Sequence, residues 1–321
     1  MASHSSLTAL FSDIASAIRA KTGGSAEIVA DAFPEAIAGI PAGGGDSGSA
    51  AAILRRTVAD YDDTEGLVTA IGSYAFFGCG SLSTVSFPAC VQVGSQAFAG
   101  CEALESMSFP VCESIAGNAF ISCYALTAAS FPQCLTVGSY VFASCTALAE
   151  VDFAAAETVS GNAFYYCRSL TQLNLPLCTD IGNYAFGYCT ALTAAALPAC
   201  EYIGSYAFYS CTSLTAVSLP SCLAVYSHAF RGCRALESVS LPRCTVIGSS
   251  AFQSCSALSA VYLAGSSLVT LSLNAFASTP LSLSTYLGYF GSVYVPESLL
   301  ASYKAAANWS VYADRITGME E

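Results

Sequence analysis

Apolar residues recur along this chain with a period of 22 residues. Between Ile71 and Phe276 each unit repeats a close variant of Ala-Phe-x-x-Cys-x-x-Leu, followed by a short alternating segment and usually by Pro. Leu fills its position in nine consecutive units: Leu82, Leu104, Leu126, Leu148, Leu170, Leu192, Leu214, Leu236 and Leu258. Phe does the same at Phe76, Phe98, Phe120, Phe142, Phe164, Phe186, Phe208, Phe230 and Phe252. This register indicates a repeat protein in which each unit packs against its neighbours.

The spacing L-x-x-V-x-L-x-x-C within such a period is typical of leucine-rich repeats, whose short strands stack into a parallel sheet. We therefore predict an α/β leucine-rich repeat solenoid over residues 71–276, with one short parallel strand per rung. Pro is expected to end each strand because it cannot donate to the ladder. A single Gly per unit, as in Gly182, is expected in a turn.

The amino-terminal residues 1–42 form a separate predicted segment. Apolar residues at i, i+3, i+4 and i+7 predict a helix over 5–22, and a second short helix is predicted over 31–39. Two short helices cannot enclose a core, so we expect this segment to dock on the solenoid, on its own copies in a homo-oligomer, or in a larger assembly. Residues 43–50 are rich in Gly and Ser and predict a flexible linker.

Both ends of the repeat array need caps that cover the last rungs. For residues 51–70 we predict an N-terminal cap, formed by a hairpin around the acidic turn 60–63. Residues 277–321 lose the repeat pattern and are predicted to form a C-terminal cap. Within it, Pro296 begins an expected helix that continues to Lys304.

Two stretches of the array carry a family resemblance. The motif A-F-x-G-C at residues 97–101 and the motif L-x-x-V-x-L-P at residues 214–220 resemble the BspA-like class of bacterial leucine-rich repeats. The ending at 295–310 is similar to that of such proteins in Gram-positive gut bacteria and their phages, and residues 7–37 resemble a segment of prophage structural proteins. The resemblance implies adhesion or recognition at a surface, with the protein associated with a virion or exposed on a cell.

All 16 cysteines fall into two columns of the repeat. One column precedes the conserved Leu and the other follows the strand. Neighbouring rungs are about 4.8 Å apart, but side chains in a stacked column point in the same direction, which disfavours disulfides. We therefore predict that the thiols are free and buried, and that those of the second column donate hydrogen bonds to backbone carbonyls of the turn. Disulfides and metal binding are the alternatives.

The composition argues against several classes of partner. Hydrophobic residues make up 54% of the chain, the formal net charge is −12 and there are only two lysines, so no basic face is available for a nucleic acid. No apolar run reaches the roughly 18 residues of a transmembrane helix, and no signal peptide is visible. We expect neither nucleic-acid binding nor membrane insertion.

Candidate catalytic groups are few and scattered. The two histidines are His4 and His228, and we expect the second to be a surface substitution. Glu105, Glu150 and Asp152 lie on or beside the strands, far apart or away from any base, so solvated surface charge is the favoured interpretation. The sequence predicts no catalytic, cofactor or metal site, and a hydrolase is retained only as a minor hypothesis.

Aromatic residues gather at the variable positions of three successive units. The candidate ligand-binding residues there are Tyr165, Tyr166, Arg168, Tyr184, Tyr188, Tyr206, Tyr209 and Arg231. Tyrosine with Ser and Gly is typical of adaptable binding surfaces, because the ring offers large contact area at low entropic cost. The alternative is that the rings stack between rungs and shield the ridge. The sequence is compatible with both interpretations.

Charge changes sign at the same place. Residues 71–157 contain six acids and no base, whereas 158–276 contain three acids and four arginines. We therefore predict a non-enzymatic recognition protein whose ligand is a protein or glycan on a bacterial or host surface. The first hypothesis is a tail-associated phage or prophage protein, and the alternative is a bacterial cell-surface adhesin.

Overall fold

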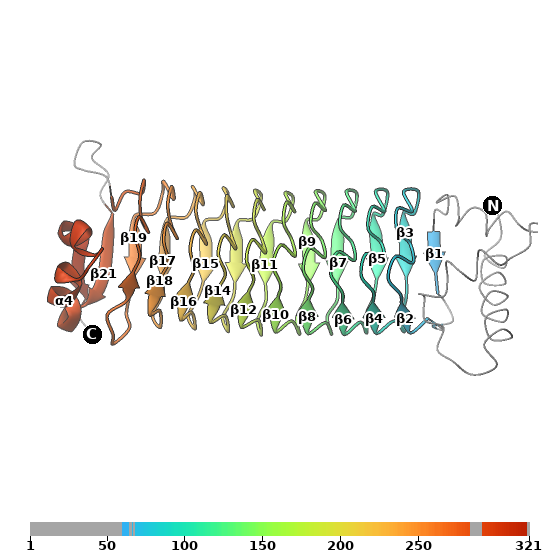
Figure 1. Cartoon of the computed structure of the whole chain (residues 1–321), viewed down its shortest axis with the longest axis horizontal. Helices are drawn as coiled ribbons and strands as arrows, with labels where there is room; N and C mark the ends of the chain where they lie inside the picture. The colour runs from blue at the N-terminus through green and yellow to red at the C-terminus, as the bar shows by residue number, and fades with distance from the viewer. Residues whose placement is uncertain (1–59, 64–65, 67, 283–290, 320–321) are drawn as a thin grey trace, which may run out of the picture.

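The structure is a computed structural model that describes residues 60–63, 66, 68–282 and 291–319. The predicted helices of 1–42, the linker 43–50 and most of the N-terminal cap lie outside the described residues. The described part is a long solenoid whose rungs stack along one axis (Figure 1). The predicted repeat solenoid is thus confirmed, and each rung takes one repeat.

Every rung of the array contributes two strands, not the single strand that we predicted. The first is three residues long in most rungs: β1 (Asp60–Asp62), β3 (Thr84–Ser86), β5 (Ser106–Ser108), β7 (Ala128–Ser130), β9 (Glu150–Asp152), β11 (Gln172–Asn174), β13 (Ala194–Ala196), β15 (Ala216–Ser218), β17 (Ser238–Ser240), β19 (Ala260–Tyr262) and the longer β21 (Ser292–Pro296). The second is two residues long: β2 (Ala70–Ile71), β4 (Gln92–Val93), β6 (Ser114–Ile115), β8 (Thr136–Val137), β10 (Thr158–Val159), β12 (Asp180–Ile181), β14 (Tyr202–Ile203), β16 (Ala224–Val225), β18 (Val246–Ile247) and β20 (Thr270–Leu271).

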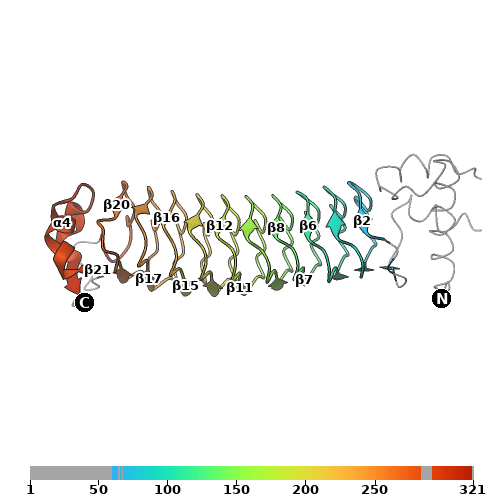
Figure 2. The ribbon, with the colours of Figure 1, turned by 90° about the horizontal axis from the view of Figure 1, so that it is seen from below.

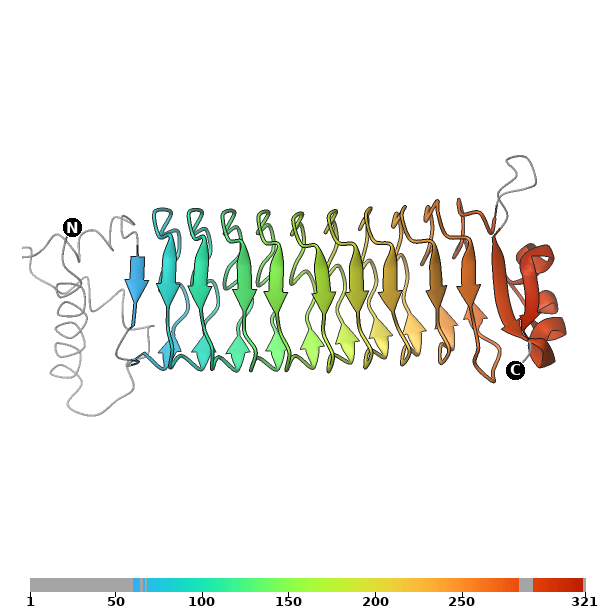
Figure 3. The ribbon, with the colours of Figure 1, turned by 180° about the vertical axis from the view of Figure 1, so that it is seen from behind.

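The two kinds of strand lie on different sides of the solenoid (Figures 2 and 3). The two-residue strands form one continuous parallel sheet of ten, in the order β2 to β20. The three-residue strands form parallel groups, β1-β3-β5, β7-β9, β11-β13-β15 and β17-β19-β21 with the terminal β22 (Ile316–Met319). The register advances by one repeat, so that Thr158 lies opposite Asp180.

No described rung contains a helix, so the array is a parallel β-solenoid and the α/β class that we predicted is wrong for this part. The third side of each rung is the Ala-Phe-x-x-Cys segment, which runs as successive turns. Two residues of each segment, such as Asn162 and Tyr166, are in the left-handed region at φ 59° and 64°. A right-handed helix cannot propagate through such residues, which explains why this side stays non-helical.

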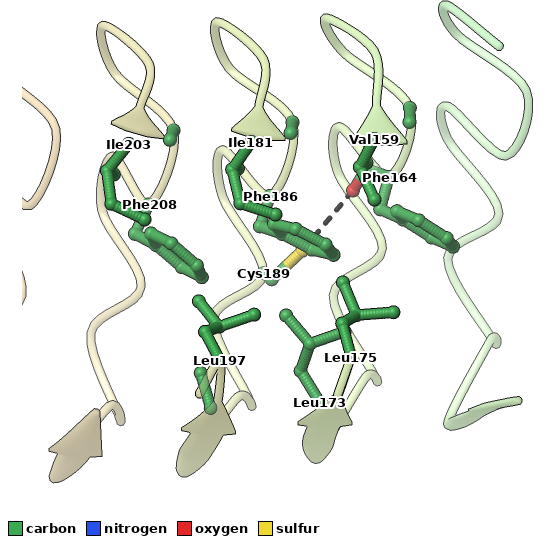
Figure 4. Packing of buried hydrophobic residues seen from close by; sticks show 14 of the residues in the cluster. Val159, Phe164, Leu173, Leu175, Ile181, Phe186, Cys189, Leu197, Ile203 and Phe208 are labelled. Carbon is green, nitrogen blue, oxygen red and sulfur yellow. Dashed lines mark hydrogen bonds between the residues drawn. The ribbon is translucent and has the colours of Figure 1, made fainter. Parts of the chain in front are cut away.

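The core consists of residue columns that run the length of the array. Phe164 is fully buried and stacks on Phe142 and Phe186 at centroid distances of 5.3 and 5.1 Å. Figure 4 shows this column beside the Leu and Ile columns of the two sheets. In the amino-terminal half a second buried Phe column, which ends at Phe153, packs against the first; from Leu175 onward Leu takes that place.

All 16 cysteines are free and buried, as predicted. In the column before Leu, a thiol donates to the Phe carbonyl of the preceding rung, as Cys189 Sγ does to Phe164 O at 3.2 Å (Figure 4). In the second column, a thiol donates to a carbonyl two residues on, as Cys178 does to Asp180 O at 3.3 Å. The second column therefore has the donor role that we predicted, and the first adds bonds between rungs.

The recurring Gly after the Ile or Val column has a different role from the predicted turn. Gly182 has no positive φ; instead, a Cβ there would lie 2.5 Å from the amide nitrogen of Gly161 in the preceding rung. Close approach of neighbouring backbones therefore excludes a side chain at this position.

The ends of the described array differ in part from the predictions. Asp60–Asp62, which we expected in the turn of a hairpin, form strand β1, parallel to β3. At the other end Pro296 closes strand β21 and is followed by a 3-10 helix, η3 (Glu297–Leu299), and by a helix of only six residues, α4 (Leu300–Ala305). A further 3-10 helix, η4 (Ser310–Arg315), leads to β22. Trp309 Nε1 donates to Val269 O at 2.7 Å and ties this end to the array.

Candidate binding surface

The side of the solenoid formed by the Ala-Phe-x-x-Cys turns carries the candidate residues. We call this side the turn ridge. Backbone amides of each turn donate to the next rung: Asn162 N to Asn183 O at 2.9 Å, Phe164 N to Ala185 O at 2.7 Å and Tyr166 N to Gly187 O at 2.9 Å. These bonds tie each turn of the ridge to the next rung.

Two columns of the ridge require left-handed backbone in every rung. The first column holds Tyr74, Gln96, Asn118, Tyr140, Asn162, Tyr184, Tyr206, His228, Ser250 and Asn274. The second column holds Gly78, Gly100, Ser122, Ser144, Tyr166, Tyr188, Ser210, Gly232, Ser254 and Ser278. A non-glycine residue in this region costs about 1–2 kcal/mol. The second column is filled by Gly or Ser except at Tyr166 and Tyr188, where a bulky residue bears that cost.

The six candidate tyrosines form one continuous cluster, which we call the tyrosine cluster. Tyr166 and Tyr188 stack at a centroid distance of 4.6 Å with an interplanar angle of 8°. In the first column Tyr184 and Tyr206 stack at 4.5 Å and 4°. Both pairs follow the repeat from one rung to the next, so the interpretation that the rings stack between rungs is correct in geometry.

Tyr165 and Tyr209 connect the two stacks edge-on. Tyr165 meets Tyr166, Tyr184 and Tyr188 at 4.5, 5.9 and 5.7 Å. Tyr209 meets Tyr188 and Tyr206 at 5.2 and 5.6 Å. All six rings are half-buried, in contrast to Tyr140, which is 42% exposed.

Gly187 makes room for this arrangement. It lies in the column of Tyr165 and Tyr209 and has no positive φ, but a Cβ there would lie 3.0 Å from the ring of Tyr165. The absence of a side chain therefore lets the Tyr165 ring lie over the next rung. The sequence alone does not reveal this role, since nothing in the repeat pattern separates such a glycine from a turn residue.

An arginine and a histidine stand at the two ends of the tyrosine cluster. The guanidinium of Arg168 lies over the ring of Tyr166 at 5.0 Å. At the other end, His228 meets Tyr206 edge-on at 4.5 Å, and its Nδ1 lies 3.1 Å from Ser249 O. His228, predicted as an isolated surface substitution, is therefore part of the cluster, which its column position beyond Tyr184 and Tyr206 could have indicated.

Arg231 is half-buried and follows Tyr209 in the same column, one rung further on. Burial and the charge of Arg231 lower the pKa of His228, so the imidazole is neutral near pH 7. Burial, together with the neighbouring phenols, raises the pKa of Tyr165 to about 12. Burial also raises the pKa of Tyr184 and Tyr188. The cluster is therefore a neutral aromatic surface flanked by arginines.

Other parts of the surface offer less for a ligand. Where the second column holds Gly78, Gly100 and Ser122, the ridge is hollowed into a shallow depression. The outward positions of the three-residue strands are mostly Ser, Thr and Ala, as the sequence predicts. Among them Asp152 accepts a hydrogen bond from Ser130 Oγ at 3.0 Å. Within the part of the chain that the structure describes, no helix has the length and apolar character needed to cross a bilayer.

The fold and the turn ridge define a class of protein, the leucine-rich repeat solenoids, which typically bind ligands on an extended surface rather than catalyse reactions. More particularly, the chain belongs to the BspA-type leucine-rich repeat family, whose repeat region matches residues 69–193 and 179–289. The predicted family is thus confirmed. The match includes none of residues 1–68, so the prophage resemblance there stays a prediction.

Solved structures of bacterial leucine-rich repeat proteins are similar to this chain. A leucine-rich repeat protein from Bacteroides ovatus is 20% identical, with 83% of this chain and 85% of that chain covered and a TM-score of 0.50. A leucine-rich cell surface protein from Faecalibacterium prausnitzii is 19% identical, with 82% and 83% covered and a TM-score of 0.39. A leucine-rich repeat protein from Eubacterium ventriosum is 18% identical, with 74% and 87% covered and a TM-score of 0.43. No curated protein matches the chain.

Proposed function

We propose that this protein is a non-enzymatic recognition protein that binds a protein or glycan on a cell surface through the tyrosine cluster. One observation carries the proposal. Tyr166 and Tyr188 occupy left-handed positions that hold Gly or Ser in the other eight rungs, so the fold does not require a ring there. A bulky residue kept at a strained position is a reason to look for function.

The scaffold suits recognition because the cluster is preorganised. Stacked and edge-on rings restrain one another, and the backbone beneath them is bonded from rung to rung. Little side-chain freedom would be lost on binding, which favours affinity. Stacking between rungs and binding to a ligand are therefore compatible, since the stack leaves each ring half-exposed.

Two hypotheses concern the setting of this recognition protein. The hypothesis of a tail-associated phage or prophage protein rests on the resemblance of residues 7–37, which lie outside the described residues, and on that of the ending at 295–310. The alternative, a bacterial cell-surface adhesin, is favoured by membership of the BspA-type family. The minor hypothesis of a hydrolase gains no support, because the turn that carries His228 and the two neighbouring turns, residues 206–212, 228–234 and 250–256, contain no carboxylate to pair with this histidine as acid or base.

A binding experiment with whole cells tests the proposal. Fluorescently labelled full chain is incubated with a panel of gut bacteria and epithelial cells, beside the variant Tyr166→Ser/Tyr188→Ser. The matched control is Tyr140→Asn, which removes an exposed tyrosine from a left-handed position with Asn in both neighbouring rungs. We expect binding by the wild type and the control and loss of binding by the double variant. A folded double variant that binds as well as the wild type would show that the tyrosines are packing residues.

A further inference from the structure

The turn ridge around the tyrosine cluster has a charge opposite to that of the whole protein. The chain has a formal net charge of −12. In the four turns 162–168, 184–190, 206–212 and 228–234, however, there are three arginines and no Asp or Glu. A local cationic strip on an acidic protein attracts anions.

The three arginines of this strip are not neutralised by the protein. Among the described residues, Arg168, Arg231 and Arg234 form no ion pair with a carboxylate. Arg168 lies over Tyr166, and Arg234 is exposed. Guanidinium groups that are not paired with a protein carboxylate are free to bind carboxylate or sulfate oxygens of a ligand, for which their fork of donors is suited.

Small residues separate the last ring of the second column from two of these arginines. Beyond Tyr188 the column continues with Ser210 and Gly232, so the ring stack ends and the ridge becomes lower. A Cβ on Gly232 would lie 3.2 Å from Ser210 Oγ, which shows how closely these two rungs approach. Arg231 and Arg234 flank Gly232 in sequence. Along the ridge, the rings of the second column are therefore followed by a step of small residues, and the rung of Gly232 carries the two arginines.

We infer that the ligand of the tyrosine cluster is an acidic glycan, an inference that rests on the proposed function. Its sugar rings pack along the tyrosines, and its carboxylate or sulfate groups bind Arg231 and Arg234 at the step beside Ser210. The strip from Arg168 to Arg234 spans three rung spacings, or about 14 Å. A strip of this length suits a few sugar rings, whereas a protein partner typically buries about 800 Å² on each side and would extend well beyond it. Phenol hydroxyls both donate and accept hydrogen bonds, as sugar hydroxyls do.

Isothermal titration calorimetry on the full chain tests this inference. The probes are oligogalacturonate, its methyl-esterified neutral form, chondroitin sulfate and a poly-glutamate peptide. We expect at least one acidic saccharide to bind, with an affinity that falls as salt is raised, and the neutral form to bind about tenfold or more weakly. Oligogalacturonate carries carboxylates only, whereas chondroitin sulfate carries both carboxylates and sulfates, so tighter binding of the second indicates a contribution from sulfate. Arg231→Gln/Arg234→Gln should weaken binding to the level of the neutral form, whereas Arg243→Gln, which lies outside the strip, should not.

Several results would overturn the inference. They are the absence of binding by every acidic saccharide at millimolar concentration, tighter binding of poly-glutamate, or unchanged affinity of the Arg231→Gln/Arg234→Gln variant. The cell experiment separates this failure from failure of the proposed function. Suppose that the chain binds cells through Tyr166 and Tyr188, and that this binding is lost when the cells are treated with protease but kept when their glycans are oxidised with periodate. The proposed recognition function then stands, and the ligand is a protein.

Discussion

The strain at Tyr166 and Tyr188 can be measured by comparing two double variants. One replaces both tyrosines by Ser, the residue found at this column position in five other rungs, and the other replaces both by Gly, found in three. Both variants remove the same rings. Only Gly also relieves the left-handed backbone, which has φ values of 64° and 61° at the two positions.

The structure gives the expected magnitudes. Tyr166 and Tyr188 take part in four ring contacts, those with each other, of each with Tyr165, and of Tyr188 with Tyr209. At about 0.5 kcal/mol for each half-exposed pair, the Ser variant should lose about 2 kcal/mol of unfolding free energy. Gly recovers about 1 kcal/mol at each left-handed position, so the Gly variant should be close to the wild type.

Urea denaturation followed by circular dichroism measures the difference, with hydrogen exchange of the amides in the turns 162–168 and 184–190 as a local readout. The local readout is needed because rungs of a repeat protein can open separately. If the Gly variant is as unstable as the Ser variant, the tyrosines are not strained and the argument for function from their position fails.

Other predictions concern the core, the cluster and the thiols. Leu170→Ala should cost about 2–5 kcal/mol because it leaves a cavity between fixed rungs, whereas exposed Thr171→Ala should cost under about 0.5 kcal/mol in the same urea denaturation. Gly187→Ala should displace the Tyr165 ring and weaken cell binding while circular dichroism stays unchanged; unaltered binding would contradict the role of Gly187. Ellman titration should find no reactive thiol in the native protein and 16 in denaturant; fewer in denaturant would indicate disulfides. Tyr165 should ionise near pH 12 in a phenolate absorbance titration; because its pKa is raised on folding from 10.0, the stability it contributes is full below pH 10 and falls as the pH rises toward 12.

The core could be predicted from the sequence because every core position repeats. Leu170 and Phe164 each belong to an unbroken column, and both are fully buried. The second strand could not be predicted in the same way. Thr158–Val159 is only two residues long, so it has no alternation that could separate a strand from a turn. It is a strand because it pairs with the equivalent positions of the two neighbouring rungs. The sequence of a single unit does not reveal this pairing.

The candidate site was predicted in part for the same reason. Tyr166 and Tyr188 were recognisable as departures from a column of Gly and Ser. Their stacking could be predicted, because residues one repeat apart are one rung spacing apart. The left-handed backbone beneath them could not be predicted, since tyrosine is not a residue that indicates positive φ. The role of Gly187 was hidden because it depends on the ring of Tyr165 in the preceding rung.

The backbone hydrogen bonds between rungs make the turn ridge suitable for recognition. Each turn is fixed by its amides, which donate to the next rung whatever side chain stands at the left-handed positions. The first column accordingly accepts Tyr, Gln, Asn, His and Ser with φ values that differ by only a few degrees. Side-chain identity there is uncoupled from the core, whereas any change at Phe164 disturbs two neighbouring rungs. Rings gathered at such uncoupled positions, in adjacent rungs and with unpaired arginines beside them, therefore call for an explanation outside folding, and a ligand provides one.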